Sequence, residues 1–221
     1  MTRRFYLLAF ASAAAVVGAC AGSGTTGLRA GPNQGTIAVQ MTDAPLVFDS
    51  VASVNIFIVR VDARRKDADS TEANDSLEVE HHDSESEHHD STTWVTIASP
   101  NASINLLALQ NGLTSLIGTA AIDSGHFRGL RLVIDPSKSN VTLKNGTVLT
   151  TTSNPPIQFF GSGKHGIDVQ LDDDLDVRPG TKTTLTIDFK LSESFSMRGL
   201  SIGHDGLVFK PSVHSHSRHD G

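Results

Sequence analysis

The chain has very few of the residues that form disulfides and large aromatic clusters. Its 221 residues include one cysteine, Cys20, one tryptophan, Trp94, and one tyrosine, Tyr6. A single thiol excludes an internal disulfide, so packing and hydrogen bonds must hold the fold together.

The chain also lacks an excess of positive charge. Its formal net charge is −6, which argues against the basic surface that nucleic-acid-binding proteins use. We therefore expect no nucleic-acid partner.

Catalytic and cofactor motifs are missing as well. There is no Gly-x-Ser-x-Gly nucleophile elbow. The stretch Gly161–Gly166 lacks the upstream glycine and the Ser/Thr of a phosphate loop. The acidic stretch Asp168–Asp176 lacks the glycine and glutamate that an EF-hand calcium loop requires. We expect a non-enzymatic protein and predict no catalytic residues.

The apolar run at the N-terminus is too short to cross a bilayer. Tyr6–Val17 follows Arg3 and Arg4, whereas a spanning helix needs about 20 apolar residues. This pattern is typical of a signal peptide. The run ends in Val17-Gly18-Ala19-Cys20, which resembles a bacterial lipobox. The alternative is a plain signal peptide with a cysteine there by chance.

The lipobox predicts where the mature protein resides. Residues 1–19 would be removed as a lipoprotein signal peptide, and Cys20 would carry acyl chains such as palmitate. Two or more chains give stable anchoring in a bilayer. Ala21 at the second mature position, rather than aspartate, favours the outer membrane of the bacterial envelope. Residues 20–34, rich in Gly, Ser and Thr, are predicted to be a flexible tether.

The negative charge is concentrated in one segment. Ten acidic residues and no Lys or Arg lie between Asp67 and Asp90. Because these ten carry −10 and the chain totals −6, the rest of the chain carries +4. Residues 62–92 contain few large apolar side chains, so we expect this acidic insert to be disordered.

The insert also contains two histidine pairs among its carboxylates. Imidazole and carboxylate groups suit Zn²⁺, Cu²⁺ or Ni²⁺, and the surrounding negative charge would concentrate cations. The alternative is a solvated, solubilising loop. The candidate metal ligands are His81, His82, Glu85, His88 and His89.

Short alternating runs closed by Gly, Asn, Asp and Pro recur through the rest of the chain. Such runs predict strands joined by tight turns. Lys144-Asn145-Gly146 predicts a hairpin, because Asn-Gly suits the positive φ angles of a type I′ turn. Residues 104–109 are compatible with a strand or a helical turn. Strands are predicted at 36–41, 51–61, 93–97, 113–122, 126–134, 140–143, 147–151, 167–171, 183–191 and 206–213.

This spacing predicts an all-β fold, an antiparallel β-sandwich over residues 35–213. Residues 214–221 are expected to be a polar, solvated tail, with His214, His216 and His219 as a weaker alternative metal site.

Several stretches together resemble one family of bacterial lipoproteins. They are the opening GTIAVQMTDAP, the strand VNIFIVRVDARR, INLLALQNGLTSLIG, GHFRGLRLVID, TTLTIDFKL and GLVFKPSV. These resemble the DUF4382 domain family from Gly35 to about Val213. The resemblance implies an immunoglobulin- or transthyretin-like sandwich at the cell envelope and carries over no catalytic residues.

Taken together, the sequence predicts a membrane-anchored envelope lipoprotein that acts as a binding or structural module. Its expected partners are the bilayer, through acylated Cys20, and an envelope protein or glycan. No cofactor is expected. The alternative is a divalent-metal-binding or sequestering protein that acts through the insert.

Overall fold

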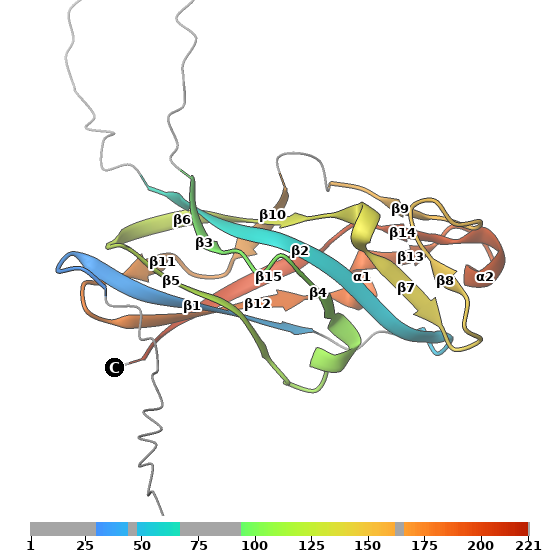
Figure 1. Ribbon diagram of the computed structural model, residues 1–221, viewed down its shortest axis with the longest axis horizontal. Coiled ribbons are helices and arrows are strands. Elements are labelled where there is room, and N and C mark those ends of the chain that lie inside the picture. The colour runs from blue at the N-terminus through green and yellow to red at the C-terminus, as the bar shows by residue number, and fades with distance from the viewer. Residues whose placement is uncertain (1–29, 44–47, 67–93, 162–165, 221) are drawn as a thin grey trace, which may run out of the picture.

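The computed structural model describes residues 30–43, 48–66, 94–161 and 166–220. This part of the chain is dominated by β-strands, which confirms the all-β prediction. Figure 1 shows an elongated body in which β2, β6 and β10 lie on one side and β1, β5 and β12 on the other. No helix in the described ranges is long and apolar enough to cross a membrane.

Most strands belong to one mixed sheet that curls around the core. Its path runs β5-β1-β12-β15-β10-β6-β2-β7-β8, with β11 beside β6 and with β3 and β4 beside β2. Its first four strands are β5 (Ser115–Asp123), β1 (Gln34–Asp43), β12 (Lys182–Phe189) and β15 (Val213–Asp220). The others are β10 (Ile167–Leu171), β6 (Gly125–Ile134), β2 (Val51–Arg65), β7 (Asn140–Leu143), β8 (Val148–Leu149), β11 (Leu175–Val177), β3 (Trp94–Ala98) and β4 (Ala102–Asn105).

Both edges of the curl come close together. A Cβ atom placed on Gly118 of β5 would lie 2.6 Å from the Cβ of Ala98 in β3. The lack of a side chain at Gly118 therefore lets the two strands approach.

A second, smaller sheet covers one end of the body. It consists of β13 (Phe195–Met197), β14 (Leu207–Phe209) and β9 (Ile157–Phe159). Phe209 contacts Phe159, Phe195 and Phe189 with ring centroids 5.0, 4.7 and 6.2 Å apart. This aromatic cluster joins the small sheet to β12. The short helices are η1 (Leu106–Leu109), η2 (Pro136–Lys138), α1 (Leu191–Ser194) and α2 (Ile202–Asp205).

The core follows the alternation of the strands. Inward residues of β1 and β12 share one buried cluster with those of β2 and β6, as the period of two requires. The fully buried members include Ile37, Val39, Met41, Leu185, Ile187, Phe189, Ile56, Ile58 and Leu132.

The expected antiparallel arrangement is wrong for three strand pairs. β1 pairs with β12, β10 with β15, and β9 with β14, all in parallel. Parallel neighbours need a long crossover connection. The chain supplies one between β1 and β12, because the strands of the opposite side lie between them in sequence.

The polar tail predicted at residues 214–221 is a strand, as far as the described part of the chain extends. β15 pairs antiparallel with β12 and parallel with β10, so it joins the two sides of the body. Ladder hydrogen bonds come from the backbone and do not require apolar side chains. The polar composition of the segment therefore concealed a central strand, and the body extends beyond residue 213.

The predicted start of the acidic insert at residue 62 is too early. β2 continues to Arg65, and the side chain of Asp62 is 1% exposed. Residues 67–93 lie outside the described ranges, so the expected disorder of the insert stays a prediction. The signal peptide, Cys20 and residues 20–29 of the predicted tether also lie outside them, and the last tether residue, Gln34, is the first residue of β1.

The type I′ turn geometry predicted for Asn145-Gly146 is found instead at Asn111-Gly112. Asn111 and Gly112 have φ angles of 63° and 79°, which suit a type I′ turn. At the predicted hairpin between β7 and β8, Gly146 has a positive φ of 87° and Asn145 does not. That hairpin forms as predicted, but as a three-residue turn. The segment 104–109 is divided between β4 and η1, which Asn105 caps by accepting a hydrogen bond from the Leu107 nitrogen.

Candidate functional site: a groove on the outer face of β1, β12 and β15

Strand register aligns polar side chains on the outer face of three adjacent strands. In β12 and β15, Thr184 is paired with Arg218 and Thr186 with His216. In β1, Gln40 is paired with Thr186. Directly paired residues project from the same face of a sheet. The inner faces of β1 and β12 are buried and apolar, so the polar set lies on the outer face. Thr184 itself is buried there, with 5% of its surface exposed.

These side chains line a groove of about 350 Å³. The sheet supplies most of its wall, and the loop between η1 and β5 supplies the rest. The groove is lined by Gln40, Thr42, Gly112, Thr114, Thr184, Thr186, His216 and Arg218.

The groove has a basic lining. Arg218 is the permanent charge among the lining residues, His216 adds a titratable imidazole, and no Asp or Glu lines the groove. The Arg218 Nε lies 3.3 Å from the Asp220 Oδ1. Its terminal nitrogens have no hydrogen bond within the described ranges. Arg218 therefore has an open donor edge.

The Asp220 carboxylate also bonds to Thr184 and Lys182. Its Oδ2 accepts from the Thr184 hydroxyl at 2.8 Å and lies 3.3 Å from the Lys182 Nζ. The Thr184 hydrogen bond, followed by Lys182, holds the pKa of Asp220 below its usual value. Two cations thus surround this one carboxylate, which leaves the Arg218 end of the groove with a surplus positive charge.

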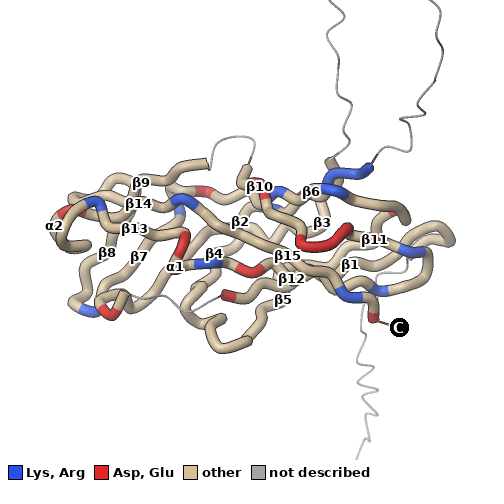
Figure 2. The backbone as a smooth tube through the Cα atoms, turned by 180° about the vertical axis from the view of Figure 1, so that it is seen from behind, with Lys and Arg blue, Asp and Glu red and all other residues tan. Residues whose placement is uncertain are grey.

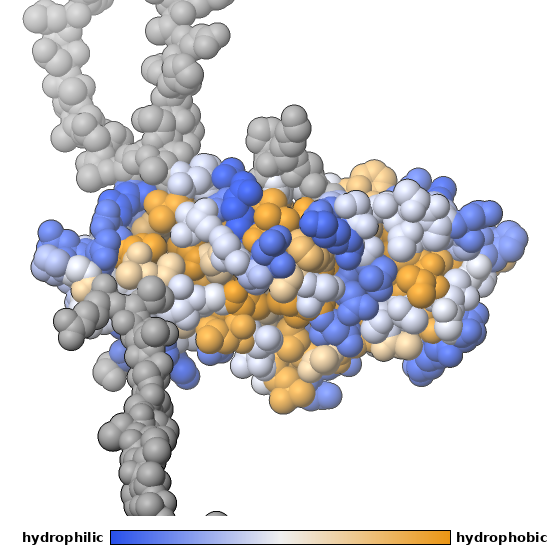
Figure 3. Space-filling view, viewed as in Figure 1, coloured by the Kyte–Doolittle hydropathy of each residue, from blue (hydrophilic) through white to orange (hydrophobic). Residues whose placement is uncertain are grey.

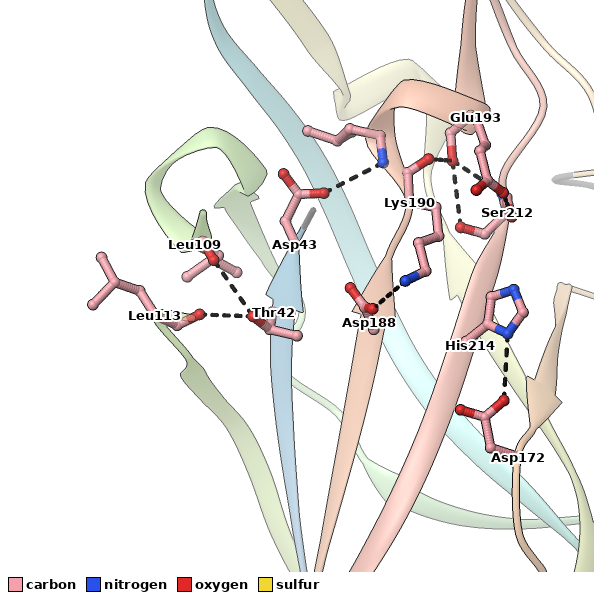
Figure 4. Close-up of polar contacts among 12 residues, drawn as sticks. Thr42, Asp43, Leu109, Leu113, Asp172, Asp188, Lys190, Glu193, Ser212 and His214 are labelled. Carbon is pink, nitrogen blue, oxygen red and sulfur yellow. Dashed lines mark hydrogen bonds and ion pairs between the residues drawn. The ribbon is translucent and has the colours of Figure 1, made fainter. Parts of the chain in front are cut away.

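Charged and titratable side chains just beyond the groove lie in pairs. The Lys190 Nζ lies 2.7 Å from the Asp188 Oδ2, and the His214 Nδ1 lies 3.4 Å from the Asp172 Oδ1. Figure 4 shows both pairs. The hydrogen bond that Lys190 donates to Asp188, together with the charge of that carboxylate, raises the pKa of Lys190. The Lys190–Asp188 pair therefore adds little net charge to the face.

The loop between η1 and β5 forms one rim of the groove. A side chain of β1 bonds to this loop, and the rim is partly apolar. The Thr42 hydroxyl donates to the carbonyl oxygens of Leu113 at 2.9 Å and Leu109 at 3.4 Å (Figure 4). Leu113 and Leu116 are each 61% exposed. Figure 3 shows apolar residues gathered over this loop and β5. The rim thus offers aliphatic surface beside hydroxyl groups.

A second polar cluster, on β2, β3 and β6, is internally satisfied. Asp62 accepts from the Thr96 Oγ1 at 2.7 Å, the Arg131 Nε at 2.8 Å and the Arg60 Nε at 3.0 Å. The Arg131 guanidinium also lies 4.3 Å from the centroid of Trp94. Figure 2 shows basic residues gathered at this end of β2.

Burial raises the pKa of Asp62, but the hydrogen bonds from Thr96, Arg131 and Arg60 outweigh it and leave the pKa below its usual value. We interpret this cluster as a structural ion-pair network.

Three histidines of the described ranges, His126, His204 and His214, each contact a single carboxylate. His126 contacts Asp176, and the Nδ1 of His204 lies 2.8 Å from Asp205. Within these ranges, no group of three or more His, Cys, Asp or Glu residues has a geometry that could hold a metal ion.

The structure does not test the predicted lipidation site or the predicted metal ligands in the acidic insert. Cys20 lies outside the described ranges, as do the candidate metal ligands His81, His82, Glu85, His88 and His89. Those assignments stay predictions.

Within β15, the three histidines predicted as a weaker site do not converge. His214 and His216 share the outer face, whereas the His219 Nδ1 lies 3.2 Å from the Thr183 hydroxyl on the other face.

Sequence reasoning missed the groove because its residues lie in separate parts of the chain. A local signal existed in β12, where TTLTID places polar residues at positions 184, 186 and 188, whereas HSHSRHD in β15 is polar at every position. Recognising them as neighbours required the strand pairing.

Comparison with known families gives one assignment. No curated protein matches the chain. The model of the family described as "Domain of unknown function (DUF4382)" matches residues 34–211, which is more than half of the chain. The match covers β1 and β12 and ends before β15. The chain therefore belongs to the DUF4382 family.

Proposed function

We propose that the protein is a lipid-anchored lipoprotein of the bacterial envelope and acts as a non-enzymatic binding module. In this proposal, acylated Cys20 attaches it to the outer membrane. The body is an immunoglobulin- or transthyretin-like β-sandwich whose partner is an envelope protein or glycan.

The observation that carries the binding role is the groove on β1, β12 and β15. Its side chains stand on hydrogen-bonded strands, so their positions are fixed before a ligand arrives. Preorganised polar groups lower the entropic cost of binding. Hydroxyl, amide, imidazole and guanidinium groups supply both donors and acceptors. This combination suits recognition of a polar partner.

The lipobox at residues 17–20 supports the anchor. The test is to express the full-length chain and a Cys20→Ser variant in a Gram-negative host that is fed an alkyne analogue of palmitate. We expect the wild-type chain to be labelled and to sediment with the outer membrane, because its acyl chains insert into the bilayer. The Cys20→Ser variant should be unlabelled and should leave that fraction.

A Ser23→Ala variant is the matched control, because it changes a nearby polar residue outside the lipobox. It should behave like wild type. An unlabelled wild-type chain with a soluble, unmodified mature N-terminus would contradict the anchor.

A further inference from the structure

We infer that the groove on β1, β12 and β15 binds an acidic glycan, a saccharide chain that carries carboxylates, with Arg218 as the principal carboxylate ligand. This inference rests on the proposed binding function and specifies its partner.

Charge is the first argument. Arg218 and Lys182 together bring two positive charges to Asp220, so one positive charge remains uncompensated beside the groove. The side chain of Arg218 is 77% exposed, and its terminal nitrogens have no hydrogen bond within the described ranges. A guanidinium edge of this kind matches the two oxygens of a carboxylate. The ligand that fits this end is therefore an anion.

The second argument is the density of neutral hydrogen-bonding groups beside Arg218. The hydroxyls of Thr114 and Thr186 and the side-chain amide of Gln40 can each donate and accept hydrogen bonds. The Thr42 hydroxyl already donates to the loop carbonyls of Leu113 and Leu109, so it is left as an acceptor. An inorganic anion offers acceptors alone, whereas sugar hydroxyls offer donors and acceptors together. The lining thus matches a polyhydroxylated molecule better than a bare anion.

Exposed aliphatic surface at the rim is the third argument. Leu116 is paired with Gln40 in the register between β5 and β1, so its side chain lies on the face that carries the groove. Leu113 lies on the adjoining loop. A sugar ring has C–H faces as well as hydroxyl edges, and removing aliphatic surface from water is favourable. Leucine at the rim can therefore cover a ring whose edge bonds to the strands.

Size and shape complete the assignment. About 350 Å³ is near the lower limit for a small-molecule site. It accommodates a short portion of a glycan chain rather than a large folded partner. The groove lies on the outer face of the sheet, so the ends of a longer chain can continue into solvent.

The test is a calorimetric titration of the full chain with oligogalacturonate, and with maltooligosaccharide of equal length as the neutral comparison. Inorganic polyphosphate is the comparison for charge without sugar. The variants are Arg218→Gln, which removes the charge, and Thr186→Val, which removes a hydroxyl at nearly constant shape. Lys210→Gln is the matched control, because it removes an exposed cation outside the groove. Circular dichroism checks that each variant is folded.

We expect oligogalacturonate to bind at least tenfold more tightly than maltooligosaccharide. Arg218→Gln should weaken that binding at least tenfold, Thr186→Val severalfold, and Lys210→Gln not at all. Equal binding of the two oligosaccharides, no binding of either, or no effect of Arg218→Gln would overturn the inference. If polyphosphate binds as tightly as oligogalacturonate and Thr186→Val has no effect, the groove recognises charge alone and the glycan assignment is wrong.

Failure of this inference is distinguishable from failure of the proposed function. Palmitate labelling and membrane fractionation do not depend on the groove. A labelled, membrane-bound protein that binds no acidic glycan would reject the inference and leave the anchor intact.

Discussion

Asp62 is a buried carboxylate whose charge is balanced by its immediate neighbours. Its side chain is 1% exposed and receives hydrogen bonds from Arg60, Arg131 and Thr96. An uncompensated charge at such a depth is costly, whereas a paired and hydrogen-bonded one is tolerated. This role could not be predicted from the sequence, because Asp62 lies close in sequence to ten other acidic residues and its partners Thr96 and Arg131 are far along the chain.

We predict that Asp62→Asn lowers the free energy of unfolding at pH 7 by about 2–3 kcal/mol. The variant keeps the shape of the side chain but weakens hydrogen bonds to two guanidinium groups. Because the folded-state pKa of Asp62 is lowered, its stabilising contribution is fully present above the unfolded pKa of about 3.9. That contribution is lost as the pH falls through the folded-state pKa.

Urea unfolding of wild type and variant from pH 7 to pH 2 measures both effects. The difference in unfolding free energy should shrink at the acid end of the series. Asp173→Asn is the matched control, because Asp173 is exposed, and it should behave like wild type. A difference that is independent of pH would contradict the role of the Asp62 charge.

At the level of elements, the sequence pattern predicts where the strands lie, but it does not predict which strands pair with one another. Alternation predicted the strands at 36–41, 51–61, 126–134 and 183–191 nearly as they occur, because burial of one face leaves a period of two in the sequence. Alternation does not state which strand lies beside which. The parallel pairing of β1 with β12 therefore could not be predicted, and neither could a groove whose wall comes from β1, β12 and β15.

β15 is the strand that the alternation of apolar residues did not predict. Its inward Ser215 is fully buried although it is polar. The apolar signal that identified β12 is therefore absent from β15, and the backbone ladder to β12 and β10 defines the strand instead.

We predict that His216→Pro in β15 lowers the unfolding free energy by about 3 kcal/mol or more. His216 is paired with Thr186 of β12 and shares the strand side of Ser212, whose carbonyl accepts from the Lys190 nitrogen, so its backbone N–H faces β12. Proline removes this backbone donor and is poorly tolerated inside a sheet. His216→Ala is the matched control, since it preserves the backbone donor, and should change stability by less than about 1 kcal/mol. Thermal unfolding of both variants decides the question. Similar melting temperatures for the two would mean that residues 213–220 contribute little to the sheet in solution.

At the scale of the whole molecule, charge is divided between two regions. The segment from Asp67 to Asp90 carries ten acidic residues, and the rest of the chain carries a net +4. The described residues themselves carry 14 Lys or Arg and 14 Asp or Glu, so their net charge is zero, and the +4 comes from Arg3, Arg4, Arg29 and Lys164 outside the described ranges. Positive charge is nevertheless gathered locally on the body, for example at the end of β2 (Figure 2) and beside the groove at Arg218. These local basic groups suit anions, whereas the acidic segment suits cations.

This division gives a prediction for metal binding that separates the two regions. We expect Zn²⁺, Cu²⁺ or Ni²⁺ titrated into the full chain to bind through His81, His82, His88 and His89, because paired imidazoles among carboxylates supply suitable ligands. Replacing these four histidines by alanine should weaken binding at least tenfold.

The matched control replaces His126 and His204 by alanine. These two are the exposed body histidines that each contact a single carboxylate. A site made of one imidazole and one carboxylate has too few protein ligands to hold a transition metal firmly, so this control should retain the affinity of wild type. Calorimetry at pH 7.5 suits the comparison, because imidazole must be neutral to coordinate a metal. If the body variant loses affinity and the four-histidine variant does not, the metal ligands lie on the sheet, and the acidic segment contributes charge and solubility alone.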